Sequence, residues 1–134
     1  LQAAPGLPDS AIEEFLRHDA PVQLGNRLCL APVTLGGVDI PAGSTLTLCI
    51  GAANRDPAVF DEPDRLVLDR QPNPHLAFGG GIHTCAGLHV ARLEARTAIA
   101  GLLRRFPGLA LAGTPVRARR ARFRGFTRLP VRAG

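Results

Sequence analysis

The chain has 134 residues, which is enough for one domain and hardly for two. Apolar residues make up 46% of the sequence and charged residues 20%, a balance that is typical of globular chains and excludes wholesale disorder. No apolar run approaches the roughly 20 residues that a membrane-spanning helix needs. We therefore expect one globular unit that has no membrane partner.

The chain carries three cysteines, Cys29, Cys49 and Cys85, too few and too widely spaced for a disulfide scaffold. The opening residues 1–5 lack the charged and then apolar order of a secretory signal. Together these features predict a reducing, cytoplasmic location. The sequence contains no Met, not even at its start, which indicates a fragment or a processed chain.

Positive charge is concentrated near the C-terminus. All basic residues are arginine, and seven of the 16 lie beyond residue 112, where Asp and Glu are absent. A basic tail of this kind is compatible with nucleic acid or an acidic partner. However, Arg120, Arg122 and Arg124 alternate with Ala, Phe and Gly, which favours the solvated face of a half-buried strand. We expect no nucleic-acid partner.

The first predicted element is a helix that follows Pro8-Asp9. Ser10 and Glu13 have the spacing of a capping box, in which the two side chains bond reciprocally to free backbone amides. Pro21 ends this helix, because the residue before a proline is pushed out of the helical region. The expected apolar stripe consists of Ile12, Phe15 and Leu16. The polar face, expected on the opposite side, holds Glu13, Glu14 and Arg17.

Short β segments follow between residues 26 and 50. The expected strands cover residues 27–30, 33–35, 38–40 and 44–50. Gly36-Gly37 suits a tight hairpin turn between the second and the third.

Residues 54–77 are rich in Pro, Asp and Asn and predict a long irregular stretch, with one helical turn opened by Asp56-Pro57. Structureless stretches of this length are usually functional. A long helix then follows Cys85 and stops at Pro107-Gly108. Its expected buried stripe consists of Leu88, Ala91, Ala95, Ile99, Leu102 and Phe106. The rest of the chain predicts two or three strands, including a terminal β hairpin.

The candidate chemistry lies in the segment 78–87, Phe-Gly-Gly-Gly-Ile-His-Thr-Cys-Ala-Gly. Glycines allow the backbone to approach a flat or bulky ligand, because they lack a Cβ and accept positive φ. Cys85 follows the glycines and precedes a helix, whose free amides and positive dipole end stabilise a thiolate. Heme iron held by a Cys thiolate is a known ligation type.

Three alternatives remain for this segment. Zinc could take ligands from His75, His83, Cys85 and His89, although their spacing fits none of the usual paired arrangements. The glycines could cradle a phosphate or dinucleotide, but the third glycine of that motif and a following Lys are absent. Cys85 could also be a buried structural thiol.

The segment 78–87 resembles the cysteine-ligand loop of the cytochrome P450 family, F-G-x-G-x-[RH]-x-C-x-G, a highly specific signature. The E-x-x-R motif of the same family matches Glu14 and Arg17. The third member of the family's structural Glu-Arg-Arg triad would be Arg65, although Leu66 follows it where the family usually has Phe. The segments 53–57 and 129–131 also resemble bacterial members.

The resemblance implies a site for heme b. Cys85 would be the axial thiolate ligand of the iron, and Phe78 would pack beside its sulfur. His83 and Arg27 match the positions that contact the heme propionates, and Arg27 would suit a carboxylate through charge-assisted bonds. The glycines of the signature, Gly79, Gly81 and Gly87, would let the loop approach the cofactor.

The resemblance further implies an α+β fold in which residues 1–134 form a single partial domain, the C-terminal part of a cytochrome P450 domain. The family's oxygen-activating central helix and the helices over the substrate pocket have no counterpart in this sequence. The implied class is iron-dependent monooxygenase, served by a redox partner; no catalytic residue is assigned. The alternative is a heme- or partner-binding module without turnover. We expect self-association, or a second polypeptide over the distal heme face.

Overall fold

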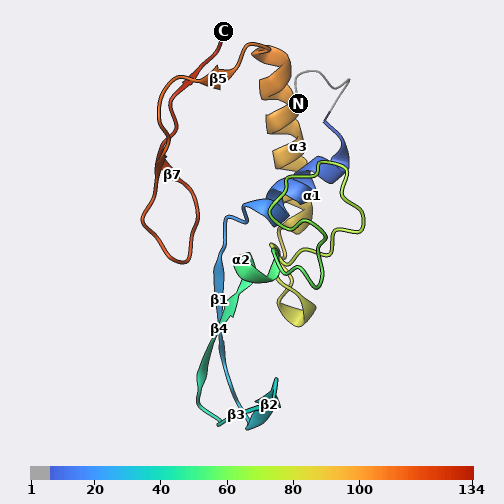
Figure 1. Ribbon diagram of the computed structural model, residues 1–134, viewed down its shortest axis with the longest axis vertical. Coiled ribbons are helices and arrows are strands. Elements are labelled where there is room, and N and C mark those ends of the chain that lie inside the picture. Colours follow the sequence, from blue (N-terminus) through green and yellow to red (C-terminus); the bar gives the residue numbers. More distant parts are fainter. Residues whose placement is uncertain (1–6) are drawn as a thin grey trace.

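The computed structural model describes residues 7–134, so the opening residues 1–5, in which no secretory signal is visible, lie outside the described part. It combines helices with small antiparallel sheets, as the expected α+β class requires (Figure 1). Helices α1 (Asp9–His18) and α3 (Leu88–Arg105) lie side by side, and a β ribbon extends away from them. No helix within residues 7–134 is long and apolar enough to cross a membrane.

The extended ribbon consists of β1 (Leu24–Leu28) and β4 (Thr45–Cys49), which pair antiparallel. Its far end carries the predicted hairpin of β2 (Val33–Leu35) and β3 (Val38–Ile40). Gly36 and Gly37 form the turn with φ of 56° and 79°, values that glycine adopts without strain. The first strand begins at Leu24, earlier than predicted, because its residues pair with β4 along their whole length.

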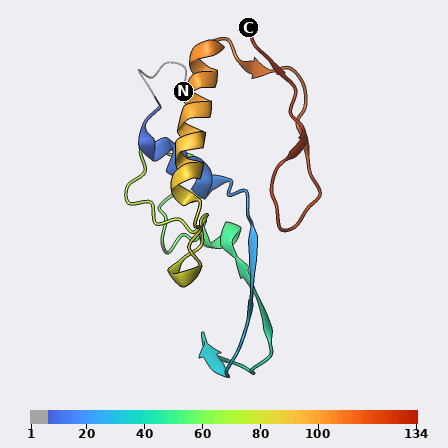
Figure 2. The same ribbon diagram turned by 180° about the vertical axis from the view of Figure 1, so that it is seen from behind.

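The C-terminal segment is a narrow ribbon that stands beside α3 (Figure 2). It contains β5 (Ala110–Leu111) paired with β8 (Val131–Arg132), and β6 (Val116–Arg117) paired with β7 (Phe126–Arg128). The strand expected at Arg120–Arg124 is wrong. The segment forms only one isolated antiparallel bridge, Phe123 with Val22, in which the Gln23 amide donates to the Arg122 carbonyl and the Arg124 amide to the Pro21 carbonyl, and no strand extends from this bridge. Two arginines of this segment, Arg117 and Arg124, have an acidic partner, because both pair with Asp19.

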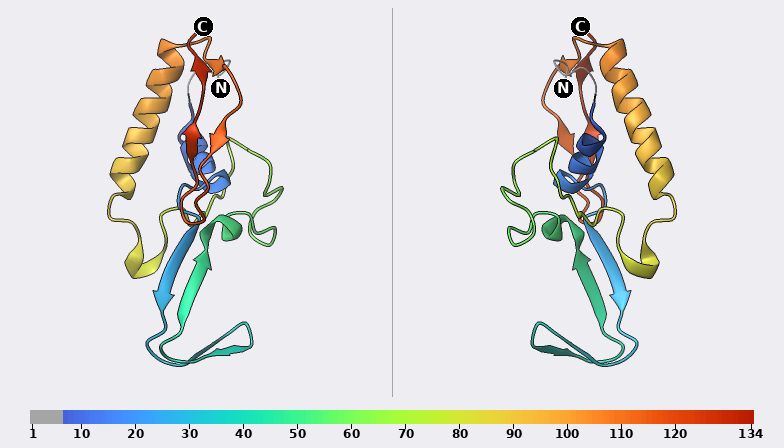
Figure 3. Two further views of the ribbon diagram at one scale, coloured as in Figure 1. Left: turned by 90° about the vertical axis from the view of Figure 1, so that its left-hand side faces the viewer. Right: turned by 90° about the vertical axis from the view of Figure 1, so that its right-hand side faces the viewer.

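Helix α3 has the extent that the sequence predicts, but its apolar stripe is not buried. None of its residues is buried, and Leu102 is 46% exposed. The reason is visible in Figure 3, where α3 runs along one side of the molecule. Among the helices and strands of the described chain, α1 is the main one that packs against it.

Helix α1 starts differently from the prediction. Its first residue is Asp9, Pro8 takes the N-cap position and no side chain caps it, so Ser10 lies inside the first turn. The capping box is therefore wrong, and Glu13 bonds to Arg92 and His75 instead. The polar face holds the Glu14–Arg17 pair that the triad resemblance implies, and a loop covers this pair. Glu14 and Arg17 are completely buried, whereas Phe15 and Leu16 are half-buried.

The covering loop is the irregular stretch that follows α2 (Ile50–Ala53), a four-residue helix that the sequence did not predict. The helical turn that the sequence predicts at Asp56-Pro57 of this loop is present as a hydrogen-bonded turn. The amides of Val59 and Phe60 donate to the Asp56 carbonyl. We call residues 54–76 the meander. Asn54 lies at the start of the meander and is fully buried. Its Oδ1 accepts the Leu76 amide at 2.7 Å, and this bond joins the two ends of the meander.

A buried ion pair fixes the meander to α1. Arg17 donates to both carboxylate oxygens of Glu14, at 2.7 and 2.8 Å. The same guanidinium donates to the backbone carbonyls of Asn54, Pro63 and Arg65 at 2.8–3.0 Å. Because these carbonyls belong to a segment without regular structure, Arg17 supplies donors that a helix or sheet would otherwise provide.

Glu14 completes the network from the acidic side. Its oxygens accept the Val67 amide at 2.8 Å, the Asn73 side-chain amide at 3.2 Å and Arg70 Nε at 3.2–3.3 Å. The resemblance implies Arg65 as the third member of the triad, but the Arg65 side chain does not bond to Glu14. Its guanidinium bonds to Glu62 at 2.7 Å and its side chain is 67% exposed, because the backbone directs Arg70 toward Glu14 instead.

Removing Arg17 tests this network. Arg17→Leu leaves the Glu14 carboxylate buried without its main partner and frees three carbonyls, and loss of one partner of a buried pair costs about 3–5 kcal/mol. We expect insoluble protein, or a strongly lowered urea midpoint. Arg65→Leu is the matched control and should change the midpoint little. Equal midpoints for the two variants would show that the buried pair carries no stability.

Acid provides a second test. Burial favours the neutral carboxyl of Glu14, but the hydrogen bonds from Arg17 and the Val67 amide outweigh it and lower the pKa of Glu14 below its ordinary 4.5. The stabilisation is therefore complete above pH 4.5 and is lost as pH falls through the lowered pKa. Unfolding followed against pH should show this loss in the wild type, and a smaller slope in Glu14→Gln. An unchanged slope in that variant would contradict the assignment.

Candidate functional site

The glycine-rich segment 78–87 forms a closed loop before α3. The Cys85 amide donates to the Phe78 carbonyl at 2.9 Å, which joins the two ends of the loop. Gly79 and Gly81 have φ of 73° and 63°, in the left-handed region that favours glycine. A Cβ on Gly79 would also lie 3.3 Å from the His83 carbonyl oxygen. The glycines are therefore required by the shape of the loop.

Cys85 stands where the loop meets α3. The helix has Gly87 as its N-cap, and the Leu88 amide donates to the Cys85 carbonyl at 3.2 Å. The thiol is free and the residue is exposed. A Cβ on Gly87 would lie 3.9 Å from the Cys85 sulfur, so the sulfur lies beside the N-terminus of α3.

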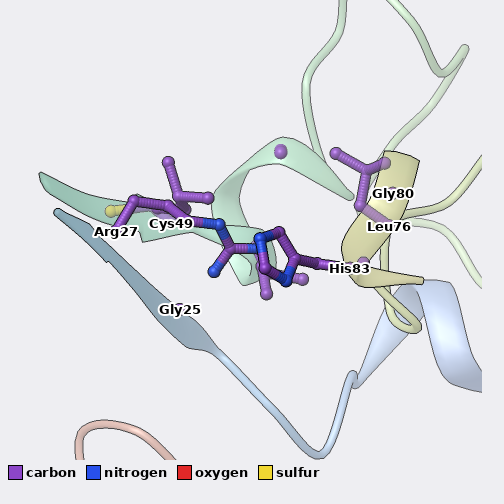
Figure 4. Close-up of a pocket in the computed structure, with 10 residues that line it drawn as sticks. Gly25, Arg27, Cys49, Leu76, Gly80 and His83 are labelled. Carbon is purple, nitrogen blue, oxygen red and sulfur yellow. The ribbon is translucent and has the colours of Figure 1, made fainter. Parts of the chain in front are cut away.

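A cavity of about 470 Å³ lies between this loop and the β1–β4 ribbon. Figure 4 shows Arg27, from β1, and His83, from the short 3₁₀ helix η1 (Gly81–His83), pointing into it. The remaining wall is largely apolar and consists of Gly25, Leu48, Cys49, Ile50, Ala53, Leu76, Gly79 and Gly80. Arg27 donates to the neighbouring Asn26 carbonyl at 2.8 Å, and no ion pair of its guanidinium is found within residues 7–134.

The structure brings together part of the predicted site. Arg27, Gly79 and His83 line the cavity, whereas Cys85, Phe78, Gly81 and Gly87 belong to the loop beside it. Sequence reasoning missed the wall residues Leu48, Cys49 and Leu76. The alternation of residues 44–50 could have indicated that one face of β4 looks into a site, but nothing local identifies the loop that it faces.

A polar cluster lies beneath the loop and was also missed. Glu13 accepts from Arg92 Nε at 2.8 Å and Nη2 at 2.7 Å, and its Oε2 lies 3.0 Å from His75 Nε2. Burial favours the neutral carboxyl, but the hydrogen bonds from Arg92 and His75 outweigh it and lower the pKa of Glu13. The Arg92 guanidinium lies 5.1 Å from the centroid of the Phe78 ring, and the His75 ring 6.2 Å from it.

The donor set of the loop and cavity fits a heme. A soft sulfur at the positive end of a helix suits iron. Arg27 and His83, which enter an apolar cavity, suit a flat ligand that carries carboxylate groups. The zinc alternative gains no support, because no group of three His, Cys, Asp or Glu side chains in the described chain could hold a metal ion. His75, one of its proposed ligands, is bonded to Glu13.

Comparisons with known proteins agree with this chemistry. The family model described as "Cytochrome P450" matches residues 7–132. The chain is 45% identical over 132 residues to the "Biotin biosynthesis cytochrome P450" of Bacillus subtilis, covering 98% of this chain and 33% of that protein. It is 43% identical over 131 residues to the "6-deoxyerythronolide B hydroxylase" of Saccharopolyspora erythraea, covering 96% of this chain and 32% of that one.

Solved structures show the same arrangement. A crystal structure of P450BioI in complex with an acyl carrier protein ligated to hexadec-9Z-enoic acid matches with a TM-score of 0.93 and 44% identity, over 98% of this chain and 34% of that one. The chain thus spans about a third of the length of the relatives it matches. Homologues in this family carry heme b as their cofactor. The 134-residue chain belongs to the cytochrome P450 family.

Proposed function

We propose that this chain forms the thiolate side of a heme site, with Cys85 as the axial ligand of the iron. One observation carries the proposal: an exposed, free thiol ends a closed glycine loop at the N-terminus of α3, and that loop also walls a cavity. Membership of a family whose members carry heme b supports the same assignment.

Each predicted residue has a defined task in this proposal. Cys85 donates its sulfur, and the N-terminus of α3 holds the negative charge on that sulfur. Arg27 and His83 bind the heme propionates from the cavity, while Phe78 packs beside the sulfur. Gly79, Gly81 and Gly87 keep side chains away from the cofactor. When bound, the heme supplies the chemistry by which one oxygen atom is inserted into an organic substrate.

The proposed class of the complete enzyme is a monooxygenase that receives electrons from a redox partner. The described chain supplies only one side of such a site. Its buried apolar residues are few: Ala11, Ile12, Ala20, Cys29 and Phe60. Exposed apolar faces tend to recruit other protein surfaces, so self-association, or a second polypeptide over the distal heme face, belongs to the proposal.

A heme- or partner-binding module without turnover is the second candidate. The observation that favours it is the exposure of α3, which has no buried residue in this chain. A site open to water cannot suppress side reactions as a closed one does. The isolated chain should therefore bind heme more readily than it oxidises a substrate at one position.

Substitution of the cysteines tests the ligand. The purified chain mixed with hemin should give a red complex whose Soret band is of the thiolate type. Cys85→Ser should lose this band, because serine offers no soft anionic donor. Cys29→Ser, outside the cavity wall, is the matched control and should keep the band; Cys49→Ser, on the cavity wall, should also keep the thiolate type of the band because it leaves the Cys85 sulfur in place. If all three variants behave alike, Cys85 is not the ligand.

The state and activity of the isolated chain form a separate test. Light scattering should show self-association, because apolar faces of α3 and the β ribbons are exposed.

With NADPH, a redox partner and candidate substrates, we expect unspecific peroxide-driven oxidation at most. A monodisperse monomer that hydroxylates one carbon of a substrate would contradict this part of the proposal.

A further inference from the structure

We propose that Glu13, Arg92 and His75 are positioning residues that act through Phe78 on the Cys85 thiolate. This inference rests on the proposed function of Cys85 as the heme ligand. We call the three side chains the Glu13 clamp. They come from α1, α3 and the segment before the glycine loop, and no sequence motif places them together.

The clamp is tightly bonded. Three nitrogen atoms surround the Glu13 carboxylate at 2.7–3.0 Å, two from the planar fork of Arg92 and one from His75. The Ala77 amide donates to His75 Nδ1 at 3.2 Å, which leaves Nε2 as the donor toward Glu13. The His75 side chain is only 3% exposed, so its orientation is fixed by these bonds and by packing.

Phe78 connects the clamp to the ligand. Its ring contacts the guanidinium of Arg92 and the ring of His75, two groups that Glu13 holds in place. Its carbonyl accepts the Cys85 amide at 2.9 Å. A shift of Phe78 therefore moves the hydrogen bond that closes the loop, and with it the place of the sulfur relative to α3.

A neighbouring ion pair provides a control that distinguishes this positioning role from a general contribution to the packing of α1 against α3. Arg96 bonds to Asp9 at 3.1 Å and also joins α3 to α1, one helical turn farther from the loop. Neither residue contacts Phe78 in the described chain. Asp9→Asn and Glu13→Gln each remove one negative charge from the same face of α1, so the two variants differ in the connection to Phe78.

Glu13→Gln is a sharp perturbation because of its hydrogen-bond chemistry. Both carboxylate oxygens accept, whereas glutamine offers one acceptor and one donor. Its amide nitrogen would face an N–H of Arg92 or of His75, so at least one bond of the clamp must break. The side chain keeps its length, which limits any effect on packing.

Amide hydrogen exchange in the heme-free chain is the first readout. The Cys85 amide, bonded to Phe78, is compared with the Asp19 amide, which bonds to the Phe15 carbonyl at the end of α1 and serves as a reference outside the loop. In Glu13→Gln the Cys85 amide should exchange roughly tenfold faster relative to Asp19, the loss expected for a charge-assisted bond. In Asp9→Asn the ratio should stay as in the wild type.

The heme-loaded chain gives the second readout. A loosened thiolate stabilises ferric iron less, so the ferric–ferrous reduction potential should rise in Glu13→Gln and stay unchanged in Asp9→Asn. Equal exchange ratios, or equal potentials, in the two variants would overturn the inference. If the wild-type chain shows no Cys85-dependent thiolate band, the proposed function is refuted. The exchange ratio, which needs no heme, then tests by itself whether the Glu13 clamp positions Cys85.

Discussion

The described structure depends on one buried ion pair, Glu14 with Arg17. The meander that follows α2 has no regular secondary structure, yet several of its backbone polar groups are turned toward α1 and bond to this pair. Arg17 donates to three of its carbonyls, and Glu14 accepts one of its amides. Taking two charges out of water is unfavourable by itself. The pair is stable because nearly every donor and acceptor of both groups finds a partner at hydrogen-bond distance.

The rest of the molecule has little core of its own. Helix α3 carries no buried residue, and large apolar side chains such as Leu30 and Ile82 are 86% and 97% exposed. A chain of this length usually buries well over half of the surface that its unfolded form exposes. Relatives with the same arrangement are about three times longer, since the chain covers 33% of one of them. Further polypeptide on these faces is therefore central to the proposed function.

The sequence predicts several features whose cause is local, although the capping box of Ser10 and Glu13, which is also local, is wrong. Gly36-Gly37 determines its own turn, and Pro107-Gly108 ends α3 without help from distant residues. Features with a distant cause were mistaken. Arg65 and Arg70 lie in the same irregular stretch, and only the folded meander decides which guanidinium reaches Glu14.

The same distinction applies to the candidate site. The signature 78–87 indicates the loop, because its glycines and its cysteine are consecutive in the sequence. The apolar wall from β4 depends on the pairing of β1 with β4, and the Glu13 clamp depends on the packing of α1 against α3. No pattern within either element specifies its partner, so these parts of the site could not be predicted.

Two consecutive glutamates explain how one short helix supports the loop from both ends. Successive residues of an α-helix are about 100° apart, so Glu13 and Glu14 face different neighbours. Arg17, which is paired with Glu14, donates to the Asn54 carbonyl, and Asn54 Oδ1 accepts the Leu76 amide just before the loop. Glu13 holds Arg92 on the first turns of α3, just after it. The loop is therefore fixed at its entry and at its exit, while its glycines stay free of side chains, and this combination suits a ligand that must approach the backbone closely and bind a sulfur at one defined place.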